Sequence, residues 1–352
     1  MLVYVGAYTG PGKAEGISVF RMDTSSGALT HVHTVETDNP SFLAFGPRRR
    51  SLYACNESGE GNPGPGVSAF KVDPETGTFT ALNRQSSHGT SPCYVSVDPK
   101  GRYVLVANYG TGTVAAYPLL EDGRLGEASD VVQHAGSGPI PRRQQGPRAH
   151  FIAPDFTGER ILSCDLGVDK IFVYRLTEDG RLQPNDLPFA QVSSGAGPRH
   201  LAFHPSGRFV YVNNEIDSTI SAFAYDADRG AFQILQTLST LPEDFSGNNS
   251  TAQIVVHPNG RFVYVSNRGH DSIAIFRIDQ ETGRLRVVGH ELTQGENPRN
   301  FAIDPSGTFL LAGNSVTHTI VTFRVNSETG QLSATGDMIE TRAPVCILFG
   351  QE

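Results

Sequence analysis

Several side chains in this sequence are of the types that bind and transform an anion. His150, Arg199, Glu215, Arg268 and Arg299 supply an imidazole, a carboxylate and three guanidinium groups. A guanidinium binds carboxylate or phosphate oxygens through paired hydrogen bonds and stabilises an oxygen that gains negative charge. An imidazole can take a proton from water, because its ordinary pKa lies near neutral pH. These residue types together suit an anionic ligand with an oxygen that gains charge, provided that the fold brings them close to one another.

A repeat runs through the whole chain and predicts the elements that would position them. Strand-like segments end in an aromatic ring, the rings stand 47 to 57 residues apart, and a Gly-x-(Leu/Phe) turn follows each one. A strand-rich repeat of this length is typical of a β-propeller blade, which can bury its faces only against neighbouring blades. The segments are 17–20, 67–70, 114–117, 171–174, 220–223, 273–276 and 320–323, and the turns begin at Gly27, Gly77, Gly123, Gly180, Gly230, Gly283 and Gly330. We therefore predict an all-β protein, a seven-bladed β-propeller with four-stranded blades, in which residues 1–352 form a single domain.

The front half of each unit predicts a hairpin. A proline is followed seven positions later by a Pro-x-Gly turn and then by an apolar run that ends in Asn, as in Pro198, Pro205 and Asn214. Residues 344–349 have the form of the first strand of such a hairpin, and residues 2–5 have the form of the second. We expect these two segments to pair and complete one blade, because closure removes exposed sheet edges.

The fourth unit can be aligned in two ways. Pro147 and Pro154 imitate the usual proline spacing, but that alignment puts Gly158 out of register. Anchoring the unit on Gly158 makes Ala149 its first position and His150 its second, and we prefer this alignment because the turn depends on the glycine. We therefore expect His150, rather than Arg148, to face the channel beside Arg199.

Equivalent positions should gather at one mouth of the propeller channel. We expect the residue after the first proline to lie opposite the Asn that ends the second strand, beside the residue after that Asn. The position after the first proline holds Ser41, Cys93, His150, Arg199, Ala252, Arg299 and Val345. The position after the Asn holds Glu57, Tyr109, Leu166, Glu215, Arg268 and Ser315. This predicts that His150, Arg199, Arg299, Glu215 and Arg268 converge. With the family resemblance described below, we expect His150, Arg199, Glu215 and Arg268 to be catalytic, and Arg299, Glu57, Asn214 and His200 to bind the substrate. Asn214 and its equivalents also suit a cap on local backbone, and any one of these residues alone could be a polar strand end.

Composition excludes several other classes of function. The formal net charge of -8 argues against a nucleic-acid partner, and no stretch approaches the roughly 20 apolar residues of a membrane span. Residues 1–5 do not have the form of a signal peptide, and the four cysteines show no metal-ligand spacing. Residues 59–66 are expected to form a Gly/Pro loop rather than a phosphate cradle, since no helix follows them. We predict a cytoplasmic protein, a monomer or weak homo-oligomer, without a metal or cofactor.

At these residues the chain resembles the seven-bladed propeller lactonase family. The matching segments are His150, 164–169, 197–201, Asn214-Glu215, 266–272 and 297–301, and the resemblance covers essentially the full length. The family includes 6-phosphogluconolactonases and fungal carboxymuconate cyclases, and the site proposed for the cyclases would fall on His150, Arg199, Glu215 and Arg268. The resemblance implies hydrolysis of 6-phosphoglucono-lactone, a small anionic sugar lactone, in the pentose phosphate pathway. Under this reading His150 is the base, Arg199 or Arg268 stabilises the oxyanion, Glu215 orients Arg199, and Arg299 binds phosphate. A carboxymuconate-type lactonizing cyclase and a non-enzymatic interaction scaffold stay open as alternatives.

Overall fold

The computed structural model describes residues 1–10, 12–58 and 66–350, so all of the predicted loop 59–66 except Gly66 lies outside the described residues. Within these ranges the strands form seven sheets of four strands each, and one 3-10 turn, η1 (Pro47–Arg49), is present. The described chain divides into two compact units, one of residues 1–34, 200–226 and 232–352 and one of residues 35–199 and 227–231.

Four sheets fall mainly in the first unit. Listed in sheet order they are β28 (Pro344–Phe349), β1 (Leu2–Ala7), β2 (Gly16–Met22), β3 (Leu29–Glu36); β16 (Pro198–Phe203), β17 (Phe209–Asn214), β18 (Thr219–Asp226), β19 (Ala231–Ser239); β20 (Ser250–Val256), β21 (Phe262–Arg268), β22 (Ser272–Ile278), β23 (Leu285–Leu292); and β24 (Pro298–Ile303), β25 (Phe309–Asn314), β26 (Thr319–Val325), β27 (Leu332–Glu340). Each sheet thus contains the hairpin predicted from the proline pattern, followed by two outer strands.

Three sheets belong to the second unit. They are β4 (Pro40–Phe45), β5 (Ser51–Asn56), β6 (Gly66–Val72), β7 (Phe79–Gln85); β8 (Pro92–Val97), β9 (Tyr103–Asn108), β10 (Thr113–Pro118), β11 (Asp130–Gln133); and β12 (Ala153–Pro154), β13 (Ile161–Asp165), β14 (Lys170–Leu176), β15 (Leu182–Gln191). The first strand of the last sheet is only two residues long, at the place where the sequence departs from the proline pattern.

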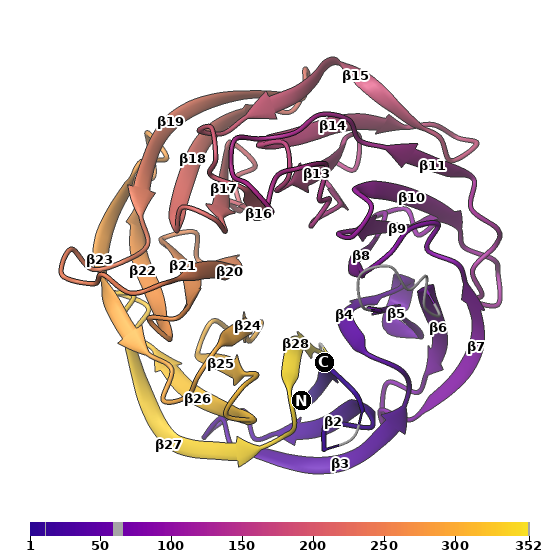
Figure 1. Cartoon of the computed structure of the whole chain (residues 1–352). Coiled ribbons are helices and arrows are strands. Elements are labelled where there is room, and N and C mark those ends of the chain that lie inside the picture. The colour runs from indigo at the N-terminus through magenta and orange to yellow at the C-terminus, as the bar shows by residue number, and fades with distance from the viewer. Residues whose placement is uncertain (11, 59–65, 351–352) are drawn as a thin grey trace. The chain divides into compact units, whose positions relative to one another are not determined.

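The two ends of the chain share one sheet, as predicted. Strand β1 pairs antiparallel with β28, and Val3 lies opposite Phe349 while Val5 lies opposite Ile347. Figure 1 marks both chain ends at this sheet. The same ladder sets Ala7 opposite Pro344, so Ala7 occupies the position that Asn holds in other sheets.

The register of the hairpins differs from the prediction by one residue. The first proline itself lies opposite the Asn, in the pairs Pro40 with Asn56, Pro92 with Asn108 and Pro298 with Asn314, and the ladder then skips one residue. The skipped residue, such as Arg299, is therefore the extra residue of a β-bulge. A bulge interrupts the regular register of the ladder and turns the side chain of its extra residue away from the regular alternation. This irregularity falls in the row of positions expected to carry chemistry.

The alignment of the fourth unit on Gly158 is confirmed. Ala149 forms an antiparallel bridge with Asp165, as the first proline does with Asn in the other sheets. The His150 N–H then donates to the Cys164 carbonyl at 2.9 Å. Gly158 has a φ of 74°, the left-handed value that favours glycine at this turn.

The repeated glycine turn packs against the neighbouring sheet. Gly283 has a φ of 69°, and a Cβ atom added there would lie 2.3 Å from the Phe209 ring. The Gly283 carbonyl accepts a hydrogen bond of 3.1 Å from the Tyr211 hydroxyl, and Tyr264 donates in the same way to Gly330 at 2.9 Å. Glycine recurs at this turn because the backbone needs both the left-handed conformation and the close approach.

Candidate active site

In the first unit, two of the predicted residues form a buried ion pair. Glu215 directly follows β17, Arg268 ends β21 in the adjacent sheet, and the carboxylate lies 2.9 Å from the guanidinium. The guanidinium also donates a hydrogen bond of 2.8 Å to the Thr251 carbonyl. This ion pair holds Arg268 in place. The orientation of Arg199 by Glu215, which the sequence suggested, stays a prediction.

A second arginine adds positive charge at the same place. Burial lowers the pKa of Arg268 from its ordinary value, the charge of Arg299 lowers it further, and Glu215 opposes both. The Arg299 guanidinium lies over the Tyr8 ring, 5.5 Å from its centroid. The buried Nε of Arg268 has no hydrogen-bond acceptor among the described residues. An anion would supply the acceptor that this donor lacks.

Tyr8 was missed by the sequence analysis. Since Ala7 pairs with Pro344, Tyr8 occupies in its sheet the same position as Glu215 and Arg268 in theirs. The split between the two chain ends hid this equivalence. Joining residues 344–349 to residues 2–7 before listing the positions would have found it.

Two predicted binding residues of this unit are engaged within the sheets. The Asn214 amide donates to the hydroxyls of Thr219 and Ser221 at 2.8 and 3.0 Å, so it caps the hairpin from its own sheet. The His200 Nδ1–H donates to the Gln253 side-chain oxygen at 2.7 Å, and His200 is buried. Both residues therefore support the strands beside Glu215 and Arg268.

In the second unit, His150 and Arg148 both contact one tyrosine. The His150 ring meets the Tyr109 ring edge-on with centroids 5.5 Å apart, and the Arg148 guanidinium lies 5.1 Å from the centre of the same ring. His150 is 4% exposed, whereas Arg148 is half-buried. The sequence analysis set Arg148 aside in favour of His150 and gave Tyr109 no role, although Tyr109 shares the repeat position of Glu215.

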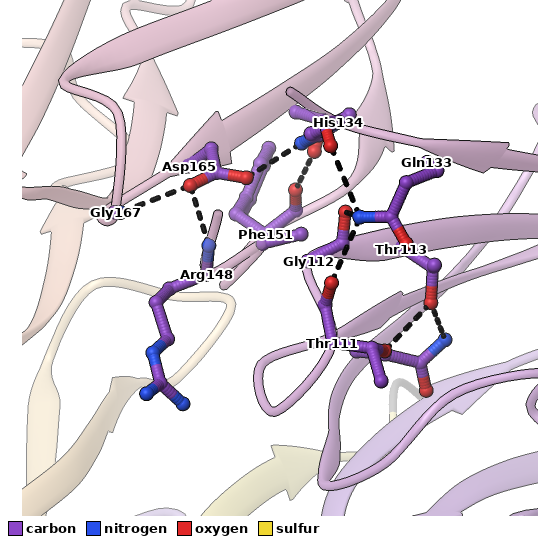
Figure 2. A network of polar contacts seen from close by, with 12 residues as sticks. Thr111, Gly112, Thr113, Gln133, His134, Arg148, Phe151, Asp165 and Gly167 are labelled. Atoms are coloured by element: carbon purple, nitrogen blue, oxygen red, sulfur yellow. Dashed lines mark hydrogen bonds and ion pairs between the residues drawn. The ribbon is translucent and has the colours of Figure 1, made fainter. Parts of the chain in front are cut away.

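A fully buried carboxylate holds the segment that carries these two residues (Figure 2). One Asp165 oxygen accepts the backbone N–H groups of Arg148 and Gly167 at 2.7 and 2.9 Å. The other accepts the His134 Nδ1–H at 2.7 Å, and both side chains of this pair have 0% exposure. The ring of His134 stacks on Phe172 with centroids 3.9 Å apart. The segment that carries His150 is thus held by a polar network whose nearest anchored amide, that of Arg148, lies two residues before it.

Asp165 replaces the Asn of the other repeats and reverses the direction of its hydrogen bond. Asn108, Asn267 and Asn314 each donate to a backbone carbonyl that lies after an outer strand, those of Ser87, Thr240 and Thr293. A carboxylate cannot donate, so His134, which directly follows β11, donates to Asp165 instead. Because His134 bonds to one Asp165 oxygen, the other oxygen can accept the backbone N–H groups of Arg148 and Gly167.

The remaining predicted residues also lie in the second unit. Arg199 is buried in β16, and Glu57 directly follows β5, where its backbone N–H donates to the Asn39 carbonyl at 2.9 Å. In residues 1–10, 12–58 and 66–350, no three His, Cys, Asp or Glu side chains gather closely enough to hold a metal ion. Over the same ranges no helix has the length and apolar character needed to cross a membrane. The four cysteines are buried thiols.

Comparison with known proteins assigns the class. The profile of a family described as "Lactonase, 7-bladed beta-propeller" matches residues 2–349. The chain belongs to this family, which confirms the predicted fold class: an all-β, seven-bladed propeller of four-stranded blades with both chain ends in one blade.

Individual relatives agree with this assignment. A Bacillus subtilis (strain 168) protein named 6-phosphogluconolactonase is 39% identical over 302 residues, which cover 85% of this chain and 83% of the relative. A Formosa agariphila protein of the same name is 34% identical and covers 85% of each chain. The structure of a periplasmic gluconolactonase from Pseudomonas aeruginosa has a TM-score of 0.93 at 33% identity, covering 99% of both chains.

Proposed function

We propose that this protein hydrolyses the ester bond of a sugar lactone, with 6-phosphoglucono-lactone as its substrate, in the pentose phosphate pathway. The observation that carries the proposal is the buried Nε of Arg268, which has no hydrogen-bond acceptor among the described residues and lies within reach of the positive charge of Arg299. A buried guanidinium donor beside a second positive charge is suited to an anionic substrate. The names of the relatives, and the family itself, support lactone opening as the reaction.

In the mechanism that we propose, His150 acts as general base. It removes a proton from water as the water oxygen attacks the lactone carbonyl carbon, and the proton later passes to the ring oxygen as the ester bond breaks. The tetrahedral intermediate carries an oxyanion, which Arg199 or Arg268 stabilises. Loss of one preorganised donor of this kind typically costs about 3 kcal/mol of transition-state stabilisation.

The other residues bind and orient. Glu215 fixes the Arg268 guanidinium through their ion pair, and Arg299, supported by the Tyr8 ring, binds the phosphate. Glu57, Asn214 and His200 stay proposals as binding residues; for Asn214 and His200 the observed hydrogen bonds favour an indirect contribution through the strands.

The deciding experiment measures hydrolysis of 6-phosphoglucono-lactone by the purified protein against the spontaneous reaction. We expect enzymatic turnover, a higher KM for Arg268→Ala, and a smaller effect of that change on unphosphorylated glucono-lactone if Arg268 contacts phosphate. Lactonization of a carboxymuconate with no lactone hydrolysis would favour the cyclase alternative. Absence of both activities would favour an interaction scaffold.

Three further expectations, on domain organisation, assembly and cellular location, accompany this proposal. We propose that the two compact units work as one domain, that the protein is a monomer or weak homo-oligomer without a nucleic-acid partner, and that it acts in the cytoplasm. The Pseudomonas aeruginosa relative is described as periplasmic, so location is to be tested by cell fractionation. Sedimentation of the purified protein tests the oligomeric state.

A further inference from the structure

One turn position recurs in the repeats, four residues beyond the Asn or Asp that ends the second strand. The backbone there is left-handed, with φ of 57° at Asp169, 56° at Ser218, 53° at Asp271, 62° at His318 and 66° at Gly112. Glycine and short polar residues tolerate this conformation best. The turn therefore presents a polar side chain, or none, at an equivalent place in each of these repeats.

That side chain holds the start of the next repeat. Asp169 accepts the Gly197 N–H at 2.8 Å and the Gly195 N–H at 2.7 Å, just before β16 begins. Asp271 accepts the Asn297 N–H at 2.9 Å, just before β24. His318 accepts the Ala343 N–H through Nδ1 at 3.0 Å, just before β28. We call this hydrogen bond, from a backbone N–H before the strand to the side chain of the turn residue, the tether. It occurs in both units.

The residue type at this turn follows what the next strand carries. The two aspartates precede the strands with Arg199 and Arg299, whereas His318 precedes the strand with Val345 and Ser218 the strand with Ala252. A carboxylate accepts several N–H groups at once, through hydrogen bonds that its charge strengthens. Asp169 takes a third donor, the Gln144 amide, at 2.7 Å. The strongest form of the tether is thus found where an arginine follows.

The tether acts where the ladder gives least support. The amide of Asn297 lies two positions before Arg299, and Arg299 is the extra residue of a β-bulge between Pro298 and Asn300. A bulged residue lies where the regular register of the ladder is interrupted, so its position depends on how the chain enters the strand. The hydrogen bond from the Asn297 N–H to Asp271 therefore fixes the path by which the chain enters β24.

We propose that Asp169 and Asp271 are positioning residues, which set the places of Arg199 and Arg299 respectively. This inference rests on the proposed function, in which those arginines bind the anionic substrate or its oxyanion. Asp165 does the corresponding work for His150 through the Arg148 amide, because the turn residue of the preceding repeat is Gly112 and has no side chain. The two strands with Arg199 and Arg299 and the segment with His150 thus each have their own aspartate.

The test is a double-mutant cycle with a matched control. Asp271→Ala should raise KM for 6-phosphoglucono-lactone by roughly 10- to 100-fold, the scale of a displaced binding group, with little change in kcat. In an Arg299→Ala background the same change should have no further effect on KM, because the residue that it positions is gone. His318→Ala removes the equivalent tether before Val345 and should leave both kcat and KM as in the wild type.

Asp169 is tested through kcat, since Arg199 is assigned to the oxyanion. Asp169→Asn keeps the shape of the buried side chain but places an N–H donor against the backbone amides. We expect kcat to fall roughly 10-fold or more, and the fall to vanish in an Arg199→Ala background. If Asp169→Asn fails to fold, Asp169→Gly provides the second variant, because it removes the acceptor while glycine suits the left-handed backbone, as Gly112 does at the equivalent position.

The outcomes separate this inference from the proposed function. Wild-type turnover with additive effects in both cycles, or with His318→Ala as damaging as Asp271→Ala, would overturn the positioning role and leave the function intact. A wild-type protein without turnover would overturn the function. In that case the same double-mutant cycles would be measured by calorimetry, as binding of 6-phosphogluconate to each variant. If the wild-type protein does not bind 6-phosphogluconate either, the positioning role is overturned as well.

Discussion

The Arg268 guanidinium lies 2.9 Å from the Glu215 carboxylate, and only 15% and 8% of the two side chains are exposed. The pair joins the ends of two strands in adjacent sheets. Removing one partner of a buried pair leaves the other charge desolvated and uncompensated, which is far more costly than losing a surface pair.

Glu215→Gln should therefore lower the free energy of unfolding by about 3 kcal/mol, as typically seen when a buried pair is broken. Urea denaturation measures the change. The control is Glu328→Gln, which removes the exposed partner of Arg261 and should cost less than about 1 kcal/mol. Equal effects of the two substitutions would show that the Glu215 pair is solvated.

His150→Ala should lower kcat by about 10²–10⁴-fold, the usual contribution of a general base. The fold should survive, because His150 lies outside the strands, beside Tyr109, rather than inside a hydrophobic cluster. Steady-state kinetics on the lactone and a melting curve measure the two effects. A folded variant with full wild-type turnover would remove His150 from the mechanism.

Gly283→Ala should destabilise the protein by about 2–4 kcal/mol, because it combines a left-handed backbone with a Cβ pressed against Phe209. Gly289→Ala in the same sheet is the matched control, since a Cβ there meets no atom within 4 Å. The control should change the free energy of unfolding by less than about 1 kcal/mol. Comparable losses in both variants would mean that the contact with Phe209 is unimportant.

His134→Ala should cost about 3 kcal/mol of stability, because the buried Asp165 carboxylate loses one of its donors and a stacked ring is removed. It should also lower kcat, since Asp165 accepts the Arg148 N–H and thereby holds the segment that carries His150. Gln133→Ala is the neighbouring control. Its exposed amide donates to the carbonyls of Thr111 and Gly112, and its loss should cost about 1 kcal/mol without changing kcat. An unchanged kcat in His134→Ala would separate this network from His150.

Chelation with EDTA should leave lactonase activity unchanged, because the proposed mechanism uses only imidazole and guanidinium groups. The assay compares treated and untreated protein at equal substrate concentration. Loss of activity that calcium or zinc restores would refute a metal-independent reaction.

The periodic sequence by itself determined the fold class, the pairing of residues 344–349 with residues 2–5, and the alignment of the fourth unit on Gly158. These follow from local requirements that recur in each unit: a Pro-x-Gly turn, an apolar run, and a glycine that packs on the next sheet. The same spacing placed His150, Arg199, Glu215, Arg268 and Arg299 in equivalent rows. The family match confirms the fold, while the roles of these residues stay predictions.

Only the tertiary structure decided which side chains meet. The β-bulge at Arg299 depends on how the hydrogen-bond ladder closes, and a spacing rule cannot show it. Glu215 pairs with Arg268 because strand ends in adjacent sheets approach each other, at a separation of 53 residues in sequence. Tyr8 joins Arg299 because the chain ends share one sheet, and Asp165 accepts from His134 because the two sheets are packed together. Local periodicity specifies strands and turns, whereas partners between sheets are set by packing.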